Sequence, residues 1–245
     1  MDSGLYAACA GLVARTQALD TIASNVANSS SSGFRGEQNV FGTVLASAQH
    51  HRLSSVNKMV NSYGVLSGSQ LDETAGTMTR TGNDLDLAIE GNAYFKVQTK
   101  TGVAYTRNGA FQVSTTGTLT TATGDTVVGE SGPIQLPSGK VAVSPDGTIS
   151  VDGALAGKLK LIAFAPGTRP SSHGTGYYVA PASAEQPMIN AAVRQGSLES
   201  SNVSPVEGMV QLISAQRAAE SMRHVLSMID SEMDKTAATD LARVS

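Results

Sequence analysis

The sequence has 245 residues, of which 15% are charged, with a formal net charge of -3, one cysteine and no tryptophan. A chain of this length can build a hydrophobic core without disulfides, and a single cysteine cannot form an internal bridge. Because acidic and basic residues nearly balance, no basic surplus exists for binding nucleic acid or an anionic membrane surface.

The first stretch, Gly4 to Arg35, begins with a heptad pattern. Its members recur at four-three spacing: Leu5, Cys9, Leu12, Thr16, Leu19, Ala23 and Val26. Helix geometry places such residues on one face, and a repeat kept over successive heptads is typical of a helix that packs against a partner helix. The serines at 29–32 and then Gly33 predict the end of this helix, because hydroxyl side chains compete for backbone groups and glycine accepts the left-handed conformation.

The uncharged residues Gly4 to Ala14 do not resemble a secretory signal. The residue ahead of them is acidic Asp2, where a secretory signal carries a basic cluster. No segment approaches the eighteen or so apolar residues of a membrane-spanning helix. We therefore expect neither a cleaved signal peptide nor membrane insertion.

Residues 37–80 are interpreted as a connector, and residues 81–203 as a β-rich domain. The strand candidates are Ala93 to Gln98, Ala104 to Arg107, Phe111 to Ser114, Thr118 to Thr121, Thr126 to Val128, Lys140 to Val143, Thr148 to Val151 and Lys158 to Phe164. Turn pairs such as Asn108-Gly109 and Asp146-Gly147 separate them, because Asn, Asp and Gly tolerate positive φ. Short strands every eight to twelve residues or so favour an all-β sandwich or barrel-like domain.

The C-terminal region is again predicted to be helical, beginning at Pro205, where the missing amide hydrogen costs least. Its apolar positions keep near three-four spacing, with one interruption at Gln216-Arg217: Val206, Val210, Ile213, Ala218, Met222, Val225, Ile229, Met233, Ala237 and Leu241. Both terminal helices are longer than a small β domain can cover. We therefore predict an α+β fold in which the N- and C-terminal helices, residues 1–36 with 204–245, pack as an antiparallel coiled-coil domain around an inserted all-β domain.

No arrangement of residues indicates catalysis. Asp84, Asp86 and Glu90 are interpreted as part of a structural turn and strand, with Arg107 as a partner for one of these carboxylates. The histidines at 50, 51, 173 and 224 lack catalytic or metal-binding neighbours, and no glycine loop for phosphate is present. We expect no enzyme activity, no cofactor and no metal.

Two competing functions would need features of their own. A secreted β-domain adhesin with a coiled-coil stalk needs an exposed aromatic platform, whereas Tyr94, Phe95, Tyr105 and Phe111 fall on predicted core strands. A wall-directed hydrolase needs a pair of carboxylates about 5 to 9.5 Å apart in a cleft. Long helices with more apolar surface than one partner can bury favour a self-assembling protein instead.

Three motifs, in this order, resemble one protein family. They are Ala23-Ser24-Asn25-Val26-Ala27-Asn28 with Gly33-Phe34-Arg35; Thr81 to Gly91 with Tyr105-Thr106-Arg107-Asn108-Gly109; and Ser201-Asn202-Val203 with the helix positions from Val206 to Glu220. They are similar to the N-terminal signature, the start of the β domain and the C-terminal helix signature of bacterial flagellar rod and hook proteins. Within that family the chain looks most like the proximal rod members, and a distal rod or hook-type axial subunit is the alternative.

The resemblance implies a structural subunit of the flagellar basal-body rod, with a D1-like β domain. Such a subunit polymerises into a helical axial tube that transmits torque and encloses the export channel. The implied partners are other copies of the chain, neighbouring proximal and distal rod proteins and the flagellar export apparatus, in a homo- and hetero-oligomer. The implied location is the periplasmic rod of the basal body, reached without a cleaved signal peptide.

The residues predicted to carry subunit assembly lie on the helix faces and at the end of the first helix. They are Leu5, Leu12, Leu19, Asn25, Asn28, Phe34, Val206, Val210, Ile213, Gln216, Arg217, Met222, Val225 and Ile229. Asn25 and Asn28 either end the helix or bond a neighbouring subunit. Phe34 is expected to anchor on the β domain or on a neighbour. Gln216-Arg217 either fixes the register between subunits or lies on a solvated face.

Overall fold

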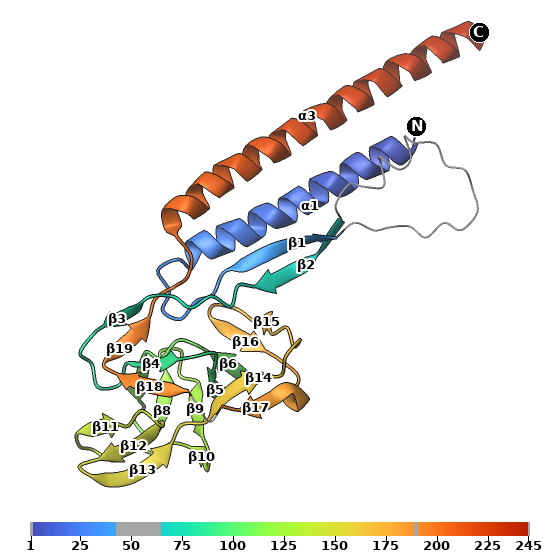
Figure 1. Cartoon of the computed structure of the whole chain (residues 1–245). Coiled ribbons are helices and arrows are strands. Elements are labelled where there is room, and N and C mark those ends of the chain that lie inside the picture. Colours follow the sequence, from blue (N-terminus) through green and yellow to red (C-terminus); the bar gives the residue numbers. More distant parts are fainter. Residues whose placement is uncertain (1, 43–64, 189–190, 245) are drawn as a thin grey trace. The chain divides into compact units, whose positions relative to one another are not determined.

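The computed structural model describes residues 2–42, 65–188 and 191–244 (Figure 1). The chain divides into two compact units. The helical unit contains residues 1–26, 37–70 and 205–245, and the β unit contains residues 27–36 and 71–204. The segment directly after the first helix therefore belongs to the β unit.

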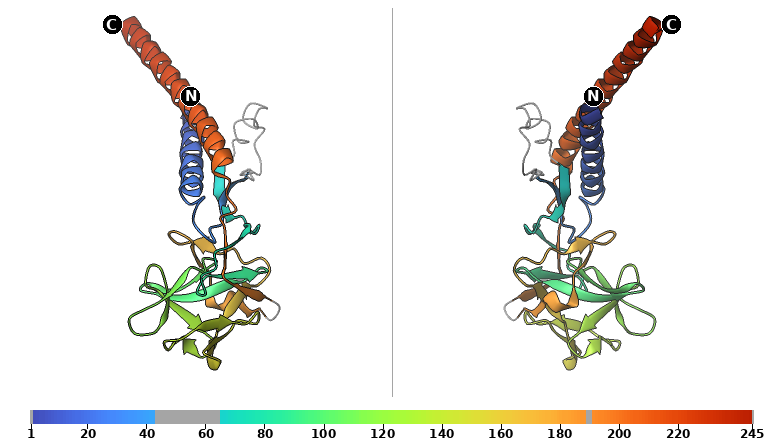
Figure 2. Two further views of the ribbon diagram at one scale, coloured as in Figure 1. Left: turned by 90° about the vertical axis from the view of Figure 1, so that its left-hand side faces the viewer. Right: turned by 90° about the vertical axis from the view of Figure 1, so that its right-hand side faces the viewer.

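The helical unit holds two long helices and a two-stranded sheet (Figure 2). Helix α1 spans Asp2–Ala27 and helix α3 spans Pro205–Val244, while strand β1 (Glu37–Gly42) pairs with strand β2 (Val65–Leu71). The predicted start of the C-terminal helix at Pro205 is confirmed. Glu207 lies in its first turn, where the helix dipole favours a negative charge.

Helices α1 and α3 run in opposite directions and approach each other at small residues. A Cβ placed on Gly208 would lie 2.6 Å from Cγ2 of Val26, and a Cβ on Gly11 would lie 3.5 Å from Cε of Met222. Among the described side chains of the two helices, only Ala14, Gly208 and Ala219 are buried. The close approach therefore buries little apolar area.

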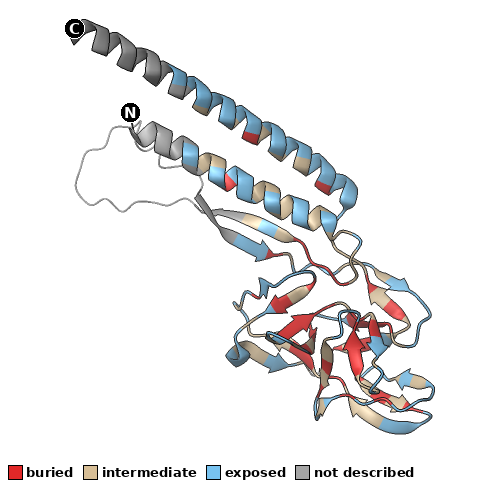
Figure 3. Cartoon of the chain, turned by 180° about the vertical axis from the view of Figure 1, so that it is seen from behind, coloured by how far each residue is buried: buried red, intermediate tan, exposed pale blue. Residues whose placement is uncertain are grey.

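The prediction of an antiparallel coiled coil is wrong. A coiled coil needs apolar side chains in contact over successive turns. On the predicted seams, however, Cys9, Thr16 and Ala23 are exposed, as are Val206, Val210 and Ile213, so that buried positions on the helices are few (Figure 3). Neither hydrophobic core cluster of the described residues contains a residue of α1 or α3. The predicted α+β fold with a coiled-coil domain is thus replaced by two helices without such a seam and a predominantly β structure.

The β unit is built from short antiparallel strands. Its largest sheet has ten strands in the order β15-β16-β6-β5-β9-β8-β7, with β10 paired to β9, β14 to β5 and β17 to β14. Strands β11-β12-β13 form a three-stranded sheet, and the pairs β18-β4 and β19-β3 form two small ones. The strand bounds are β3 (Met78–Arg80), β4 (Leu87–Glu90), β5 (Tyr94–Thr99), β6 (Gly102–Thr106), β7 (Phe111–Val113), β8 (Leu119–Thr121), β9 (Thr126–Gly129), β10 (Gly132–Pro133), β11 (Val141–Val143), β12 (Thr148–Val151), β13 (Ala154–Lys158), β14 (Leu161–Phe164), β15 (Ser171–Ser172), β16 (Tyr177–Val179), β17 (Glu185–Pro187), β18 (Ala192–Gln195) and β19 (Ser197–Glu199), with a 3-10 turn, η1, at Ala182–Ala184.

The core of the β unit is formed by the inward faces of these strands. The four aromatic residues that the sequence places on core strands, Tyr94, Phe95, Tyr105 and Phe111, are all buried. The rings of Phe95 and Phe111 meet edge to face with centroids 5.0 Å apart, an arrangement that aromatic quadrupoles favour. The β-rich part of the predicted fold therefore fits, and the aromatic platform of the adhesin alternative is not supported.

The predicted turn at Asp146-Gly147 is confirmed between β11 and β12. Gly147 has φ +84°, in the left-handed region that favours glycine, and its N–H donates to the carbonyl of Ser144 at 2.9 Å. The Asp146 carboxylate accepts hydrogen bonds from the N–H and hydroxyl of Thr148. Local turn chemistry thus sets this hairpin.

A half-buried polar cluster ties β17 to β5 and β6. The Glu185 carboxylate accepts hydrogen bonds from Nζ of Lys96 at 2.8 Å and from the hydroxyl of Tyr105 at 2.5 Å. Burial alone would raise the pKa of the Glu185 carboxyl, but the hydrogen bonds from Lys96 and Tyr105 and the lysine charge outweigh it and hold the pKa below its usual range. The ionised carboxylate is therefore the stabilising form.

This depressed pKa predicts a pH-dependent contribution to stability. A carboxyl group whose folded-state pKa is below its unfolded value of about 4.3 stabilises above that pH, and loses the contribution as the pH falls through the folded pKa. We expect Glu185→Gln to lower the melting temperature of the β unit near neutral pH, and the melting curves of the variant and the original chain to converge toward pH 3 or so. If the difference in melting temperature between the two chains stayed constant with pH, the ionised Glu185 carboxylate would not be the stabilising form. Glu130→Gln, which removes a carboxylate from an exposed ion pair, serves as the control.

Candidate functional site

Residues 27–36 connect the end of α1 to the β unit, and we call them the arm. The arm is held by backbone and side-chain hydrogen bonds to three separate segments of the β unit. The N–H of Gly33 donates to the carbonyl of Glu199 (2.7 Å), the N–H of Arg35 to the Tyr178 hydroxyl (3.0 Å) and the N–H of Gly36 to Oδ1 of Asn202 (2.8 Å), while the carbonyl of Gly36 accepts from the N–H of Asp72 (2.8 Å).

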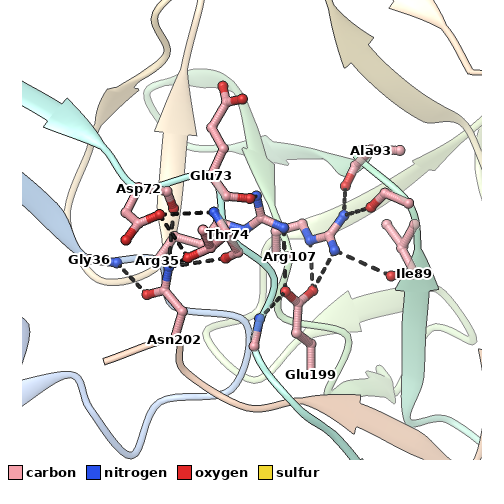
Figure 4. Close-up of polar contacts among 12 residues, drawn as sticks. Arg35, Gly36, Asp72, Glu73, Thr74, Ile89, Ala93, Arg107, Glu199 and Asn202 are labelled. Atoms are coloured by element: carbon pink, nitrogen blue, oxygen red, sulfur yellow. Dashed lines mark hydrogen bonds and ion pairs between the residues drawn. The ribbon is translucent and has the colours of Figure 1, made fainter. Parts of the chain in front are cut away.

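Beneath the arm, the Arg107 guanidinium and the Glu199 carboxylate form a buried ion pair (Figure 4). Nε and Nη2 of Arg107 lie 2.7 Å and 2.6 Å from Oε2 of Glu199, and both side chains are 1% exposed. The remaining N–H groups of Arg107 donate to the carbonyls of Ile89, Gly91 and Ala93. Burial lowers the pKa of the Arg107 guanidinium, and the Glu199 carboxylate opposes that shift. This pair joins β19 to the strands around β4 and β5.

A second arginine, Arg35 of the arm, approaches the same carboxylate. Its Nη2 lies 3.4 Å from Oε1 of Glu199, and its Nη1 donates to the carbonyl of Glu73. The guanidinium carbons of Arg35 and Arg107 lie 5.9 Å and 5.8 Å from the centroid of the Tyr94 ring, within cation–π distance. We call Arg35, Tyr94, Arg107 and Glu199 the joint.

The joint contains two guanidinium groups and one carboxylate, so it holds an excess positive charge in a buried place. Arg35 Nε and the Tyr94 hydroxyl are the two buried side-chain atoms in the described part of the chain that have no hydrogen-bond partner. Burial also raises the pKa of Tyr178 to about 12, so its hydroxyl is neutral at pH 7 and can accept the Arg35 N–H. The joint therefore fixes both the segment that leaves α1 and the strand that precedes α3.

Glycine is required where the arm crosses the β unit. Gly33 has φ +66°, and a Cβ placed on it would lie 2.3 Å from the carbonyl carbon of Arg107. Outside the arm, Gly76, whose N–H donates to the Glu199 carboxylate, is equally constrained, because a Cβ on it would lie 1.8 Å from the carbonyl oxygen of Ser200. Contacts this short cannot be relieved without moving backbone. Helix α1 itself already ends at Ala27, so the role of Gly33 is close packing against Arg107 rather than helix termination.

The predicted residues at the end of α1 make contacts within the chain. Nδ2 of Asn25 donates to the carbonyl of Glu37 at 2.8 Å, and Oδ1 of Asn25 accepts from the Glu37 N–H at 2.9 Å, which ties α1 to β1. Asn28 accepts from the Ser31 hydroxyl at 3.4 Å in the turn that follows the helix. Phe34 is buried in the β unit. These side chains thus shape the start of the arm.

The prediction that Arg107 pairs with Asp84, Asp86 or Glu90 is wrong, because Arg107 pairs with Glu199 and Glu90 pairs with Arg194. The Asp86 carboxylate instead accepts from the Thr81 hydroxyl at 2.6 Å and from Nδ2 of Asn83 at 3.1 Å, which closes the turn before β4. Arg107 is directed to Glu199, 92 positions further along the chain. No local pattern indicates such a pairing.

The first turns of α3 carry an exposed apolar patch. Val206, Met209, Val210 and Ile213 are 71%, 51%, 63% and 51% exposed, and their spacing places them on one helix face. We call these four residues the α3 patch. No described residue of the chain covers it, and exposed apolar clusters of this kind often mark contact surfaces.

The other predicted assembly residues are spread over different faces. Gln216, Arg217 and Val225 are exposed, Leu12, Leu19 and Met222 are partly buried, and the side chains of Leu5 and Ile229 lie outside those described. The sequence prediction included Met222 of the less exposed face of α3 but missed its other members, Gly208, Leu212, Ala215, Ala219 and Leu226. This set also has four-three spacing, and its small residues were the signal that could have identified it.

A surface groove of about 670 Å³ lies beside the turn at 82–85 of the β unit. Its lining includes Leu85, Val113, Leu136 and Val141, and Asp84 supplies its one carboxylate. The groove therefore lacks the carboxylate pair that the hydrolase alternative requires. Within the described residues, no group of three or more His, Cys, Asp or Glu side chains could hold a metal ion, and no helix is both long and apolar enough to cross a membrane.

Three family models match separate parts of the chain. The model described as "Flagella basal body rod protein" matches residues 5–35, which include most of α1 and all of the arm except Gly36. The model "Flagellar hook protein FlgE/F/G D1 domain" matches residues 88–151 of the β unit. The model "Flagellar basal body rod FlgEFG protein C-terminal" matches residues 194–239, from β18 into α3. The arm, Arg107 and Glu199 thus fall in three different matched regions.

Relatives are similar over nearly the whole chain. The flagellar basal-body rod protein FlgF of Rhizobium meliloti (strain 1021) is 34% identical over 248 residues, which cover 98% of each chain. The FlgF protein of Salmonella typhimurium is 32% identical over 246 residues, with 94% of this chain and 95% of that protein covered. The rod protein FlgG of Bacillus subtilis (strain 168) is 29% identical over 250 residues. The chain therefore belongs to the flagellar basal-body rod protein family.

Proposed function

We propose that this chain is a structural subunit of the bacterial flagellar rod that polymerises through its terminal helices into a helical axial tube. The observation that carries the proposal is the α3 patch, four apolar side chains that no described residue of the chain covers. Helices with few buried residues gain their missing burial from neighbouring copies, and a surface that meets a different surface on the next copy builds an open helical assembly. The tube transmits torque and encloses the export channel.

The partners proposed are other copies of the chain, the adjoining proximal and distal rod proteins, and the flagellar export apparatus that delivers the subunit to the periplasmic part of the basal body. The names of the FlgF and FlgG relatives support a place in the rod. The scarcity of buried residues among the described side chains of α1 and α3 supports helices that become ordered on incorporation, because a helix without a packed face gains little to offset its ordering entropy.

A truncation tests this proposal. Removing residues 1–26 deletes the part of α1 that belongs to the helical unit and leaves the whole arm in place. We expect the truncated subunit to keep the melting transition of the β unit and to be absent from basal bodies isolated from cells that lack the full-length chain. Electron microscopy and immunoblotting of those basal bodies provide the measurement, and the full-length chain expressed in the same cells is the control. A truncated subunit found in rods at the normal amount would refute assembly through the terminal helices.

A further inference from the structure

The hairpin of β12 and β13 carries the most exposed large apolar side chain among the described residues. Leu155 of β13 is 76% exposed, and neither hydrophobic core cluster of the β unit contains it. Single exposed leucines are common on protein surfaces, so exposure alone assigns no role to this one. The backbone on both sides of Leu155, however, holds its side chain outward.

A β-bulge lies directly after Leu155. Ser150 of β12 is opposite Leu155. The preceding residue of β12, Ile149, is opposite Gly157, which leaves Ala156 as an extra residue of β13. Such an extra residue interrupts the regular alternation of a strand and re-aims the side chains beside it.

The two-residue turn ahead of Leu155 is held in one conformation. Both of its residues have positive φ, +50° at Asp152 and +82° at Gly153, as in the mirror-image turns that match the twist of a hairpin. Asp152 is the one non-glycine residue with positive φ in the part of the chain that the structure describes. Its carboxylate accepts a hydrogen bond from the N–H of Lys140 at 3.0 Å. Leu155 therefore projects from a hydrogen-bonded hairpin rather than from an irregular loop.

The surface groove of the β unit has a lining that suits an apolar side chain. Its less exposed members are apolar, since Leu136 is buried and Leu85 and Val141 are partly buried. Polar members such as Asp84 and Ser138 are exposed. An apolar floor inside a polar rim is the arrangement that receives an apolar anchor from a partner.

The hairpin and the groove lie on opposite edges of the three-stranded sheet. In the order β11-β12-β13, Val141 of β11 lines the groove and Leu155 belongs to β13, so one copy can present both features to two different neighbours. We propose that Leu155 inserts into the groove of a second copy of this chain and lies there beside Leu85, Val113 and Val141. A contact between two different surfaces is heterologous, so it repeats from copy to copy along an open assembly.

A second copy is the occupant because the contact is too small to select a free partner. Stable interfaces bury about 1,200 Å² or more, and one hairpin tip buries much less than that. Burial of a single leucine raises an association constant by about tenfold to a hundredfold, which matters where copies are already held side by side. The inference therefore rests on the proposed function, and it adds a contact between β units to the contacts of the terminal helices.

Cysteine cross-linking in isolated basal bodies tests this contact. The full-length chain carries Cys9→Ser, because its native cysteine is exposed, together with Leu155→Cys and Val113→Cys. A short thiol cross-linker should join two copies at least tenfold or so more than in the control, which combines Leu155→Cys with Val103→Cys. Val103 and Val113 are both 40% exposed, but only Val113 lines the groove.

The outcomes of the cross-linking separate the contact from the proposed function. A chain that is present in rods without the cross-link between positions 155 and 113 would overturn the contact, and so would a cross-link from position 155 to a different protein. If the chain with Cys9→Ser alone is absent from rods, the proposed function fails, and the contact that depends on it fails as well.

Charge substitutions test whether the two positions pair with each other. In cells that lack the original chain, Leu155→Glu should lower the amount of subunit in rods by at least about tenfold, because its carboxylate enters a groove that already contains Asp84. Val113→Lys supplies the counter-charge, so the double variant should recover most of the loss. Both positions are exposed in the single chain, and the melting temperature should stay nearly unchanged. If the double variant recovers nothing, Leu155 does not lie in the groove of a neighbour.

Discussion

Replacing Val210 and Ile213 by aspartate should abolish incorporation of the subunit into rods while leaving the subunit folded. Both side chains are exposed in the single chain, so the new carboxylates stay in water and the free energy of unfolding should change by no more than about 0.5 kcal/mol. If a neighbouring copy covers the α3 patch, each buried and unpaired carboxylate costs about 3 kcal/mol or more. That cost corresponds to a loss of at least roughly a hundredfold in the association constant per residue.

The measurement is the amount of subunit in isolated basal bodies, together with swimming motility and the melting curve of the purified chain. Gln211→Asp with Ser214→Asp is the matched control, since it adds the same charge at exposed positions of the same helix turns outside the patch. We expect the control to incorporate and the patch variant to fail. Normal rods built from the patch variant would show that this face stays in water after assembly.

The strands of the β unit were largely predictable because their signals are local. Thr148–Val151 was predicted as a strand from its β-branched residues and flanking turns, and β12 has those bounds. The turn at Asp146-Gly147 needs only a residue that accepts positive φ beside one whose side chain bonds the backbone. The pairings of β14 with β5 and of β16 with β6, by contrast, join segments far apart in sequence and were not predicted.

The helices were predictable as elements but not in their packing. A four-three pattern can be counted on two faces of α3, one through Val206, Val210 and Ile213 and one through Gly208, Ala215 and Ala219. The prediction chose the face with the larger apolar side chains, and the structure brings α1 close to the face with the smaller ones. Hydrophobic spacing shows that a helix has an apolar face, but it does not show whether the partner belongs to the same chain.

The joint could not be predicted, because its members come from the arm, β5, the end of β6 and β19. Arg35 and Glu199 stand 164 positions apart, and only Arg35 lies in one of the three motifs that carry the family resemblance, without any sign of a partner. Burial of an arginine is unusual, so a charged residue inside an otherwise apolar or glycine-containing motif gives the only available signal. That signal predicts that the arginine forms a buried ion pair, but it does not identify the acidic residue of the pair.

Glu199→Gln is expected to be the most destabilising conservative substitution in the β unit. It keeps the side-chain shape and removes the single carboxylate of the joint, which leaves the buried guanidinium groups of Arg35 and Arg107 without a counter-charge. Removing one partner of a buried ion pair costs about 3–5 kcal/mol. For a unit of this size, that loss lowers the melting temperature by roughly 10 °C.

Thermal and urea unfolding of the purified chain measure this loss, with Glu130→Gln as the matched control. Glu130 pairs with Lys158 at 3.5 Å, but both side chains are about half exposed, so the same substitution there should cost no more than about 1 kcal/mol. Combining Glu199→Gln with Arg35→Gln should recover part of the loss, because it removes the less well bonded of the two uncompensated charges. Equal stability losses for Glu199→Gln and Glu130→Gln would mean that the joint contributes no more than an exposed ion pair, and that the glycine contacts and the apolar core alone hold the arm to the β unit.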